Sequence, residues 1–282
     1  MTTATLTVPI IAAPARAARV RALPTLAARR LALSVRSPRA IAVPLMAPVL
    51  FALVVAPALA DGVSSPAQRP LYMTFFCVAT CGLLIPLNCM FFGLGVLVDK
   101  QHGAMRELLV APIRRASIVF GNLAAAAIVT ALQLVVLLLA SVFRGAHYVV
   151  SDRLFWFVAG AFLLIAVTYG IAEVLVTRLT SPEEYSGVIP VVAIVPFFFA
   201  GSLYPITSLP TWLADIAKML PLTHALALFR YGLTAHGAQA LHNIWGMSNA
   251  TEMAALSLGV LALYATLTTA GAVRLFTKSG TS

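Results

Sequence analysis

Long stretches without a charged side chain alternate with short polar segments along most of this chain. The clearest pair is 71–98 and 116–143, neither of which contains Asp, Glu, Lys or Arg. Roughly 17–25 consecutive apolar residues are enough for a helix to cross the ~30 Å hydrocarbon core of a bilayer. The pattern predicts six membrane-spanning helices, at Ile41–Ala60, Tyr72–Val98, Ser117–Phe143, Leu154–Thr177, Gly187–Leu203 and Met253–Leu275.

Composition supports the same class. Hydrophobic residues make up 61% of the chain and charged residues 10%, whereas soluble domains average about 45–50% and 25%. We therefore expect an all-α integral membrane protein with one membrane domain at 41–275, a tail at 1–40 and a short tail at 276–282.

Basic residues are divided unevenly between the predicted loops. With the N-terminus in the cytoplasm, the outer loops carry five of them, namely Arg69, Arg144, Arg153, Lys218 and Arg230. The other fourteen fall on the cytoplasmic side, namely Arg16, Arg19, Arg21, Arg29, Arg30, Arg36, Arg39, Lys100, Arg106, Arg114, Arg115, Arg178, Arg274 and Lys278. Because cytoplasmic loops retain Lys and Arg, we expect a multi-pass protein of the cell (inner) membrane with both termini cytoplasmic. The same bias accounts for the net charge of +10, so no nucleic-acid partner is expected.

The first forty residues are basic and contain no acid. No clean small-residue cleavage site stands before a mature domain, so a secretory signal is not expected. A mitochondrial transit peptide is one alternative, since such segments are basic and poor in acids. We favour an amphipathic helix along the inner membrane face, at about 24–37. Its apolar side would hold Leu23, Leu26, Ala27 and Leu33 and its polar side Arg29 and Arg36, although Arg30 falls near the apolar arc.

The sequence contains none of the common catalytic motifs. It has no G-x-x-x-x-G-K-[ST] phosphate loop, no H-E-x-x-H and no G-x-S-x-G. Cys77, Cys81 and Cys89 all lie in the second predicted span, where no His or carboxylate accompanies them, so we interpret them as packing residues. We expect no catalytic residue, no metal site and no ATP site in this chain.

Glu173 is the one acid well inside a predicted span. It could serve as a proton site, because ionisable groups inside a membrane are costly and often functional. It could instead reach water or pair with Arg178. Since so little proton-handling chemistry is present, we expect the energy source to reside in another chain.

A charged segment lies between the second and third predicted spans. Residues 99–115 read DKQHGAMRELLVAPIRR and hold six of the 28 charged side chains. A short helix can form over 103–110, and Pro112 would end it. Such a helix could transmit movement from a soluble partner, although an interfacial loop with ordinary topogenic charge fits the composition equally well.

This segment resembles the coupling-helix region of ABC-2-type permeases. The family pattern is roughly acid-Arg-acid-x-Gly-Thr-Leu-(Glu/Arg)-x-Leu-Leu-x-x-Pro, in which Gln101 replaces the second acid and Ala104 the Thr. The resemblance implies a cytoplasmic coupling helix that contacts an ATPase through Asp99, Lys100, Gly103, Met105, Arg106, Glu107, Leu108, Leu109 and Pro112.

A second segment, 197–230, carries three prolines that divide it into semi-apolar pieces too short to cross a membrane. Such pieces can dip into the outer leaflet as re-entrant helices where protein covers their backbone. In ABC-2-type permeases the fifth span ends in Gly-x-x-x-Pro, then come Leu-Pro-x-Trp-Leu and a Pro-Leu-(Thr/Ser)-x-Ala run ending in Arg. The positions that match are Gly201, Pro205, Leu209, Pro210, Trp212, Leu213, Pro221, Leu222, Thr223, Ala225 and Arg230.

We therefore expect extracellular re-entrant helices within 204–237. The alternative is a seventh span over 212–230. The lone histidine of this region, His224, is interpreted as a packed or interfacial residue rather than a ligand.

Taken together, the two segments resemble the permease subunit of an ABC exporter of the daunorubicin-resistance or nodulation-factor type. The resemblance implies a second permease subunit, identical or related, and two cytosolic ABC ATPase subunits that would hold ATP and Mg²⁺. The implied cargo is an amphiphilic drug, a lipid-like molecule or a glycolipid, with polysaccharide as the alternative, and membrane lipid surrounds the protein. A substrate pathway in this family would be lined by Asn88, Phe91, Phe197, Phe198 and Phe199. A proton-coupled carrier using Glu173 and a membrane-embedded enzyme or scaffold remain the competing classes.

Overall fold

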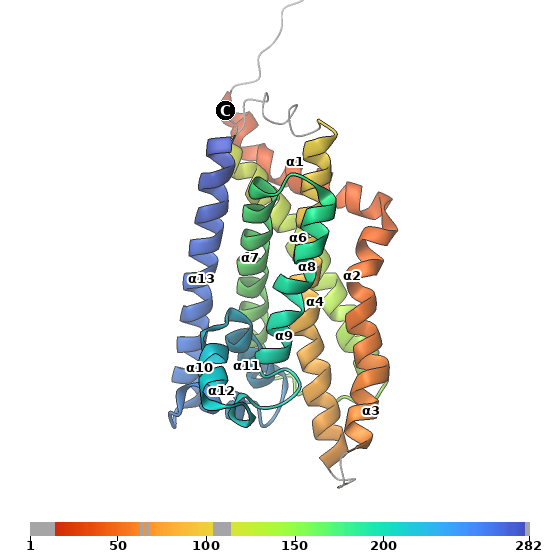
Figure 1. Ribbon diagram of the computed structural model, residues 1–282, viewed down its shortest axis with the longest axis vertical. Helices are drawn as coiled ribbons and strands as arrows, with labels where there is room; N and C mark the ends of the chain where they lie inside the picture. Colours follow the sequence, from red (N-terminus) through yellow and green to blue (C-terminus); the bar gives the residue numbers. More distant parts are fainter. Residues whose placement is uncertain (1–14, 63–64, 66–67, 104–113, 280–282) are drawn as a thin grey trace, which may run out of the picture.

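The protein is described by a computed structural model that covers residues 15–62, 65, 68–103 and 114–279. The regular elements in this part of the chain are all helical (Figure 1). Their bounds are α1 Ala15–Arg36, α2 Pro38–Leu50, η1 Phe51–Val55, α3 Ala56–Asp61, α4 Arg69–Gln101, α6 Arg115–Val142, α7 Leu154–Arg178, α8 Pro182–Ala193, α9 Val195–Phe199, η3 Ile206–Ser208, α10 Thr211–Met219, α11 Pro221–Leu233, α12 Ala238–Trp245 and α13 Ala250–Ser279.

Six helical segments are long and apolar enough to cross a membrane, as the sequence predicts. They are Ile41–Asp61, Arg69–Gln101, Arg115–Val142, Leu154–Arg178, Pro182–Phe199 and Ala250–Lys278. The first of these is a stack of α2, η1 and α3, in which a π-helical turn follows the prolines inside α2.

The fifth span begins at Pro182 rather than at Gly187 and ends at Phe199 rather than at Leu203. Its start is set by Ser181, whose hydroxyl accepts a hydrogen bond from the Glu184 backbone N–H at 3.1 Å. The two acids that follow the cap lie in the first turn, where the helix dipole favours negative charge.

Helix α4 is the centre of the bundle. Its 33 residues span about 50 Å at 1.5 Å per residue, and it packs against α2, α6, α7, α8 and α11. Most of its side chains are buried, including all three cysteines, none of which forms a disulfide. A rigid helix that contacts so many neighbours can carry a displacement from one end of the bundle to the other.

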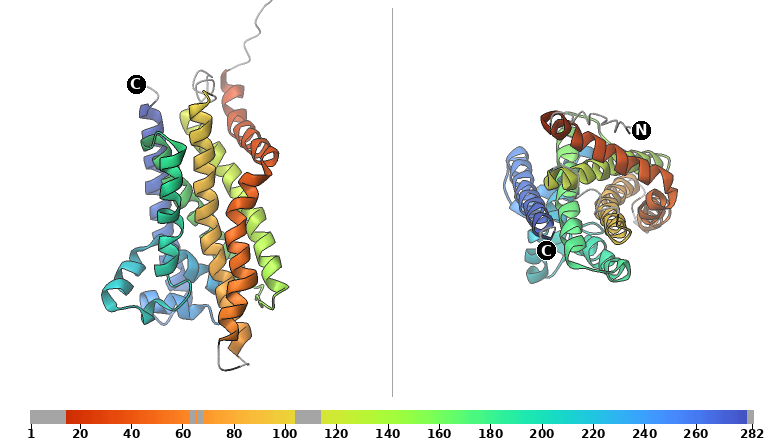
Figure 2. Two further views of the ribbon diagram at one scale, coloured as in Figure 1. Left: turned by 45° about the vertical axis from the view of Figure 1, so that its right-hand side comes forward. Right: turned by 90° about the horizontal axis from the view of Figure 1, so that it is seen from above.

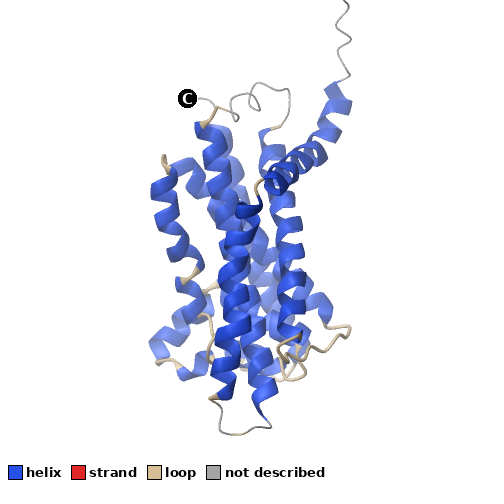
Figure 3. Cartoon of the chain, turned by 90° about the vertical axis from the view of Figure 1, so that its right-hand side faces the viewer, coloured by secondary structure: helices blue, strands red, loops and turns tan. Residues whose placement is uncertain are grey.

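The two ends of the bundle differ in structure. Helix α1, the end of α4 and the end of α13 lie at one end, which we call the α1 end (Figures 1 and 3). The short helices α10, α11 and α12 gather at the opposite end, which we call the α12 end. The last residues of 41–61 and the first residues of α4 lie there too (Figure 1). Six candidate spans within the described residues separate α1 from the end of α13, so an even number of crossings returns the chain to the same end.

Helix α1 runs obliquely across its end of the bundle rather than along it (Figure 2). It packs on α6, where Gly121 allows close approach: a Cβ at that position would lie 2.8 Å from the Leu26 Cβ. Leu26 and Ala27 are buried in this contact, whereas Leu23 is 42% exposed and Leu33 36% exposed. The helix also ends at Arg36, one residue before the predicted Ser37.

Helices α10 and α11 meet at an angle of 82°. At 9 and 13 residues they measure about 14 and 20 Å, so neither is long enough to cross a bilayer alone. The bend argues against a straight seventh span over 212–230. Tyr264 on α13 holds the bend in place, because its hydroxyl donates to the Met219 carbonyl at 2.9 Å.

Candidate functional site

Two polar clusters interrupt the apolar interior, one at each end of the bundle. The first, which we call the Arg30 cluster, joins α1 to the last turns of α4. Arg30 Nη1 donates to Asp99 Oδ2 at 2.7 Å, and Arg30 Nη2 donates to the Phe92 carbonyl at 3.0 Å. The Arg30 side chain is only 8% exposed and that of Asp99 27%.

A glycine makes room for this arginine. The guanidinium of Arg30 lies against Gly95, and a Cβ at that position would collide with Nη2. Arg30 therefore lies on the inward face of α1 because it has a partner on α4, which explains its irregular place in the amphipathic pattern. The sequence analysis had not identified it as a functional residue.

The residues after Asp99 tie α4 to the connection between α7 and α8. Lys100 Nζ donates to the Val176 carbonyl at 3.3 Å, and Gln101 Nε2 donates to the Thr180 carbonyl at 3.1 Å. Gly103 then adopts a left-handed backbone conformation with φ +79°. Of the predicted coupling residues the structure thus describes Asp99, Lys100 and Gly103, and it brings the first two into one network with α1 and α7.

The remaining coupling residues lie outside the described part of the chain. They are Met105, Arg106, Glu107, Leu108, Leu109 and Pro112. The contact that this segment is expected to make with an ATPase therefore stays a prediction.

Glu173 is buried in α7 and 1% exposed. It accepts a hydrogen bond from the Tyr169 hydroxyl one turn earlier, while its Oε2 has no hydrogen-bond partner in the described residues. Glu173 forms no ion pair with Arg178 within the described chain. Its surroundings are those of a packed interior carboxyl group rather than a group that reaches water at the helix end.

At the α12 end the first and last residues of the predicted re-entrant motif contact each other. Arg230, in the last turn of α11, donates from Nη1 to the Gly201 carbonyl at 2.8 Å and from Nη2 to the Ser202 carbonyl at 3.0 Å. Its guanidinium carbon lies 3.7 Å from the centre of the Phe75 ring on α4, a cation–π contact. Gly201 and Arg230, 29 residues apart, are therefore direct partners.

Gly201 has a specific backbone requirement at this contact. Its φ is +78°, a conformation that residues with a side chain rarely adopt, and a Cβ there would lie 2.8 Å from Ile206 Cγ2. This turn ends the fifth span and directs its carbonyl groups at Arg230.

The other motif residues shape the same region. Pro210 precedes α10 as its N-cap and Pro221 opens α11, positions where proline costs no helical hydrogen bond. Trp212 is 65% exposed on α10, as expected of an interfacial tryptophan. His224 is buried, with its ring nitrogens 2.9 Å from the Lys218 carbonyl and 3.3 Å from the Ser257 hydroxyl.

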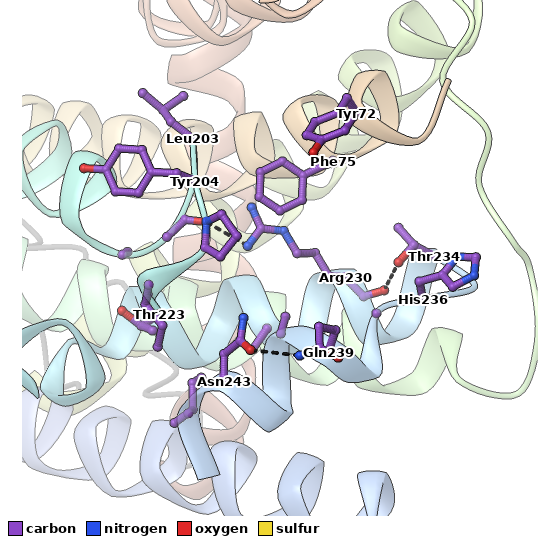
Figure 4. Close-up of a pocket in the computed structure, with 18 of the residues that line it drawn as sticks. Tyr72, Phe75, Leu203, Tyr204, Thr223, Arg230, Thr234, His236, Gln239 and Asn243 are labelled. Carbon is purple, nitrogen blue, oxygen red and sulfur yellow. Dashed lines mark hydrogen bonds between the residues drawn. The ribbon is translucent and has the colours of Figure 1, made fainter. Parts of the chain in front are cut away.

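A cavity of about 490 Å³ opens beside Arg230 (Figure 4). Its walls come from the start of α4, the 200–206 turn, α11 and the 234–244 segment. The lining is mostly apolar. Its polar side chains come from Gln68, Tyr72, Tyr204, Thr223, Arg230, Thr234, His236, Gln239 and Asn243. Nothing in the sequence brought these segments together in advance, because they are separated by up to about 175 positions (Gln68 to Asn243).

The predicted pathway residues occupy different environments. Asn88 is fully buried and donates from Nδ2 to Thr130 Oγ1 at 2.5 Å, which joins α4 to α6. Phe197 is also buried, packed edge-on against Phe51 with ring centres 5.8 Å apart. Phe198 is 46% exposed, and Phe91 and Phe199 are half-buried. Within the described residues no group of three or more His, Cys, Asp or Glu side chains lies close enough to hold a metal ion.

Comparison with known proteins identifies what this arrangement is similar to. A family model described as "ABC-2 type transporter" matches residues 21–234. Similar curated proteins are each named "Putative transport permease ycf38". They come from Porphyra purpurea (31% identical over 143 residues), Pyropia yezoensis (29% over 143) and Cyanophora paradoxa (28% over 139). Each alignment covers 49% of this chain and 48% of the relative, so the chain spans about half the length of the curated relatives it matches.

Proposed function

The chain belongs to the ABC-2 type transporter family and is a transmembrane transport permease, and from this premise we propose that it is the permease subunit of an ATP-driven exporter. The family in general works with an ABC ATPase. In our proposal two cytosolic ATPase subunits hold ATP and Mg²⁺, and a second permease subunit faces this one across the membrane. The chain itself supplies no catalytic residue.

The proposed orientation places the α1 end in the cytoplasm of a cell whose inner membrane holds the protein. Fourteen of the nineteen Lys and Arg residues belong to the sequence segments that this orientation assigns to the cytoplasmic side. The excess of positive charge on the cytoplasmic side supports the assignment. The ATPase subunits would then dock beneath α1 and residues 99–115.

The observation that carries the proposal is the ion pair between Arg30 and Asp99. It fastens α1 to α4 at Asp99, the first residue of the segment that resembles a coupling helix. Lys100 and Gln101 extend the connection to the end of α7. A push on residues 99–115 would therefore reach α1, α4 and α7 together rather than one loop alone.

The proposed mechanism uses α4 as the transmitting element. ATP-driven closure of the ATPases would displace the start of the 99–115 segment, and α4 would carry that displacement along its length. At the far end α4 contacts Arg230 through Phe75, so the re-entrant helices would move with it. Alternating access needs only that the cargo binds the two states differently.

The proposed cargo is an amphiphile: a drug, a lipid-like molecule or a glycolipid. Phe198, with 46% exposure on the fifth span, is the pathway residue best placed to meet such a molecule. Substituting Phe198 and Phe199 with alanine should change which substrate is exported, without changing the amount of ABC ATPase that co-purifies with the chain. Loss of the co-purifying ATPase without any change in substrate preference would contradict this pathway. Export of a polysaccharide instead of an amphiphile would assign the alternative cargo.

Co-purification tests the proposed function directly. The tagged chain is isolated in mild detergent from its native cell, beside an Arg106→Glu, Pro112→Ala double variant. Arg144→Glu is the matched control, because Arg144 is exposed at the α12 end. We expect an ABC ATPase with the wild type and the control, and much less with the double variant. No ATPase in any sample would reject the proposal.

The buried carboxyl group of Glu173 favours one competing function, a proton-coupled carrier, because its Oε2 has no partner in the described residues. Transport measured in reconstituted vesicles distinguishes the ATP-driven exporter from the proton-coupled carrier. Transport that requires ATP and the ATPase supports the exporter. Transport driven by a pH gradient without the ATPase, and abolished by Glu173→Gln, would replace it with the carrier.

A further inference from the structure

We propose that the cavity beside Arg230 is a binding site for an anionic amphiphile, in particular for the headgroup of an acidic phospholipid of the surrounding leaflet. The proposal goes beyond the export function and does not depend on the direction of transport. It rests on the charge, the unused donors and the shape of this cavity (Figure 4).

The charge of Arg230 is not compensated by a neighbouring acid. The residue is only 7% exposed, and no carboxylate of the described chain forms an ion pair with it. No Asp, Glu or Lys lies among the residues that line the cavity. A buried cation is costly unless an anion or several hydrogen-bond acceptors face it. Two carbonyl oxygens and the face of the Phe75 ring meet part of this requirement, and an anion in the cavity would meet the rest.

Polar side chains of the cavity wall offer hydrogen-bond donors, and one nitrogen of the adjacent guanidinium has no partner. Arg230 Nε is buried and has no partner in the described part of the chain. Across the cavity, Gln239 donates to Asn243 Oδ1 at 3.0 Å, which leaves the Asn243 amide N–H groups without a partner in that pair. Phosphate oxygens accept from such donors and pair well with a guanidinium.

The walls have the two-sided character of an amphiphile site. Phe75 and Leu203 form apolar surface near the guanidinium, whereas Thr234, Gln239 and Asn243 form the polar side (Figure 4). A volume of about 490 Å³ falls in the ~300–1,000 Å³ range of small-molecule sites. A small inorganic anion would leave the apolar wall unused, and a neutral lipid would leave the charge unmatched. An acidic lipid matches both.

The test measures binding to the purified full-length permease in neutral detergent by titration calorimetry. The probes are dihexanoyl phosphatidylglycerol below its micelle concentration, dihexanoyl phosphatidylcholine and inorganic phosphate. We expect the acidic lipid to bind about tenfold or more tightly than either of the others. Equal binding of the two lipids would overturn the anion requirement. Equal binding of phosphate and the acidic lipid would assign a free-anion site and overturn the lipid proposal.

Variants place the binding in this cavity. Arg230→Gln should weaken binding of the acidic lipid about tenfold or more, and Arg230→Lys should keep part of it. Arg153→Gln is the matched control, because Arg153 stacks on the Tyr231 ring at the same end but lies outside the cavity. It should bind like the wild type.

A second variant covers the case in which Arg230→Gln does not fold. Ala240→Trp fills the cavity from α12 and leaves the hydrogen bonds of Arg230 to residues 201 and 202 in place. Its thermal unfolding in detergent verifies folding, and its affinity for the acidic lipid should fall as far as that of Arg230→Gln. Wild-type affinity in a folded Ala240→Trp variant would overturn the site.

Discussion

Replacing Asp99 with asparagine removes the negative charge that faces Arg30 and keeps a side chain of nearly the same shape. The substitution leaves the Arg30 guanidinium, whose side chain is 8% exposed, facing a neutral amide at the original distance of 2.7 Å. Removing one partner of a buried ion pair costs roughly 3–5 kcal/mol in proteins. Because the Asp99 side chain is 27% exposed rather than fully buried, we expect a smaller cost of about 2 kcal/mol.

A double-mutant cycle isolates the pair from other effects of each substitution. The free energy of unfolding is measured by detergent denaturation for wild type, Asp99→Asn, Arg30→Gln and the double variant. Each single variant should lose about 2 kcal/mol, and the double variant should lose about 1.5 kcal/mol less than their sum. The Arg30→Gln variant also loses the bond to the Phe92 carbonyl, which the cycle subtracts.

Asp61→Asn provides the matched control. Asp61 pairs with Arg69 at 3.7 Å, with 75% and 44% side-chain exposure respectively, and exposed pairs contribute only about 0–1 kcal/mol. The control should therefore unfold like the wild type. If the losses of unfolding free energy in the two single variants add up, within about 0.5 kcal/mol, to the loss in the double variant, the ion pair does not stabilise the contact between α1 and α4.

Three further predictions address the fold and its orientation. Gly201→Ala should cost about 1–2 kcal/mol of unfolding free energy, because its φ of +78° disfavours a side chain, whereas Gly187→Ala, with open space at its Cβ, should be neutral or stabilising in the same thermal assay. Asn88→Ala removes the 2.5 Å bond between α4 and α6 and should cost about 0.5–2 kcal/mol in detergent unfolding; an unchanged midpoint would mean that the bond contributes nothing. A cysteine at Trp212 should react with a membrane-impermeant maleimide in intact cells and one at Lys278 only after permeabilisation, while the buried native cysteines stay unlabelled; the reverse pattern would invert the proposed orientation.

The number and order of the spans could be predicted from local patterns in the sequence. Uninterrupted apolar runs such as 71–98 have one stable outcome in a bilayer, a helix that satisfies its own backbone groups. The prolines and charges of 205–230 likewise indicated helices too short to cross, and the structure bends α10 against α11 by 82°. These features are local, so reading along the chain is sufficient. The predicted start of the fifth span at Gly187 was five residues late, because the first turn of α8 carries two charged residues, Glu183 and Glu184, and therefore does not continue the apolar run.

The partners of the charged residues, in contrast, depend on how the helices pack in three dimensions. Arg30 and Asp99 are 69 positions apart, and Arg230 and Gly201 are 29 apart. Neither pairing can be recognised from the periodicity of the sequence. Each depends on which helices pack together and on how far they are shifted along the axis of the bundle. Periodicity therefore showed Arg30 only as an irregular position on α1. The cavity beside Arg230 exists because α4, α11, α12 and the 200–206 turn converge without filling the space between them, and that outcome depends on the shapes of many side chains at once.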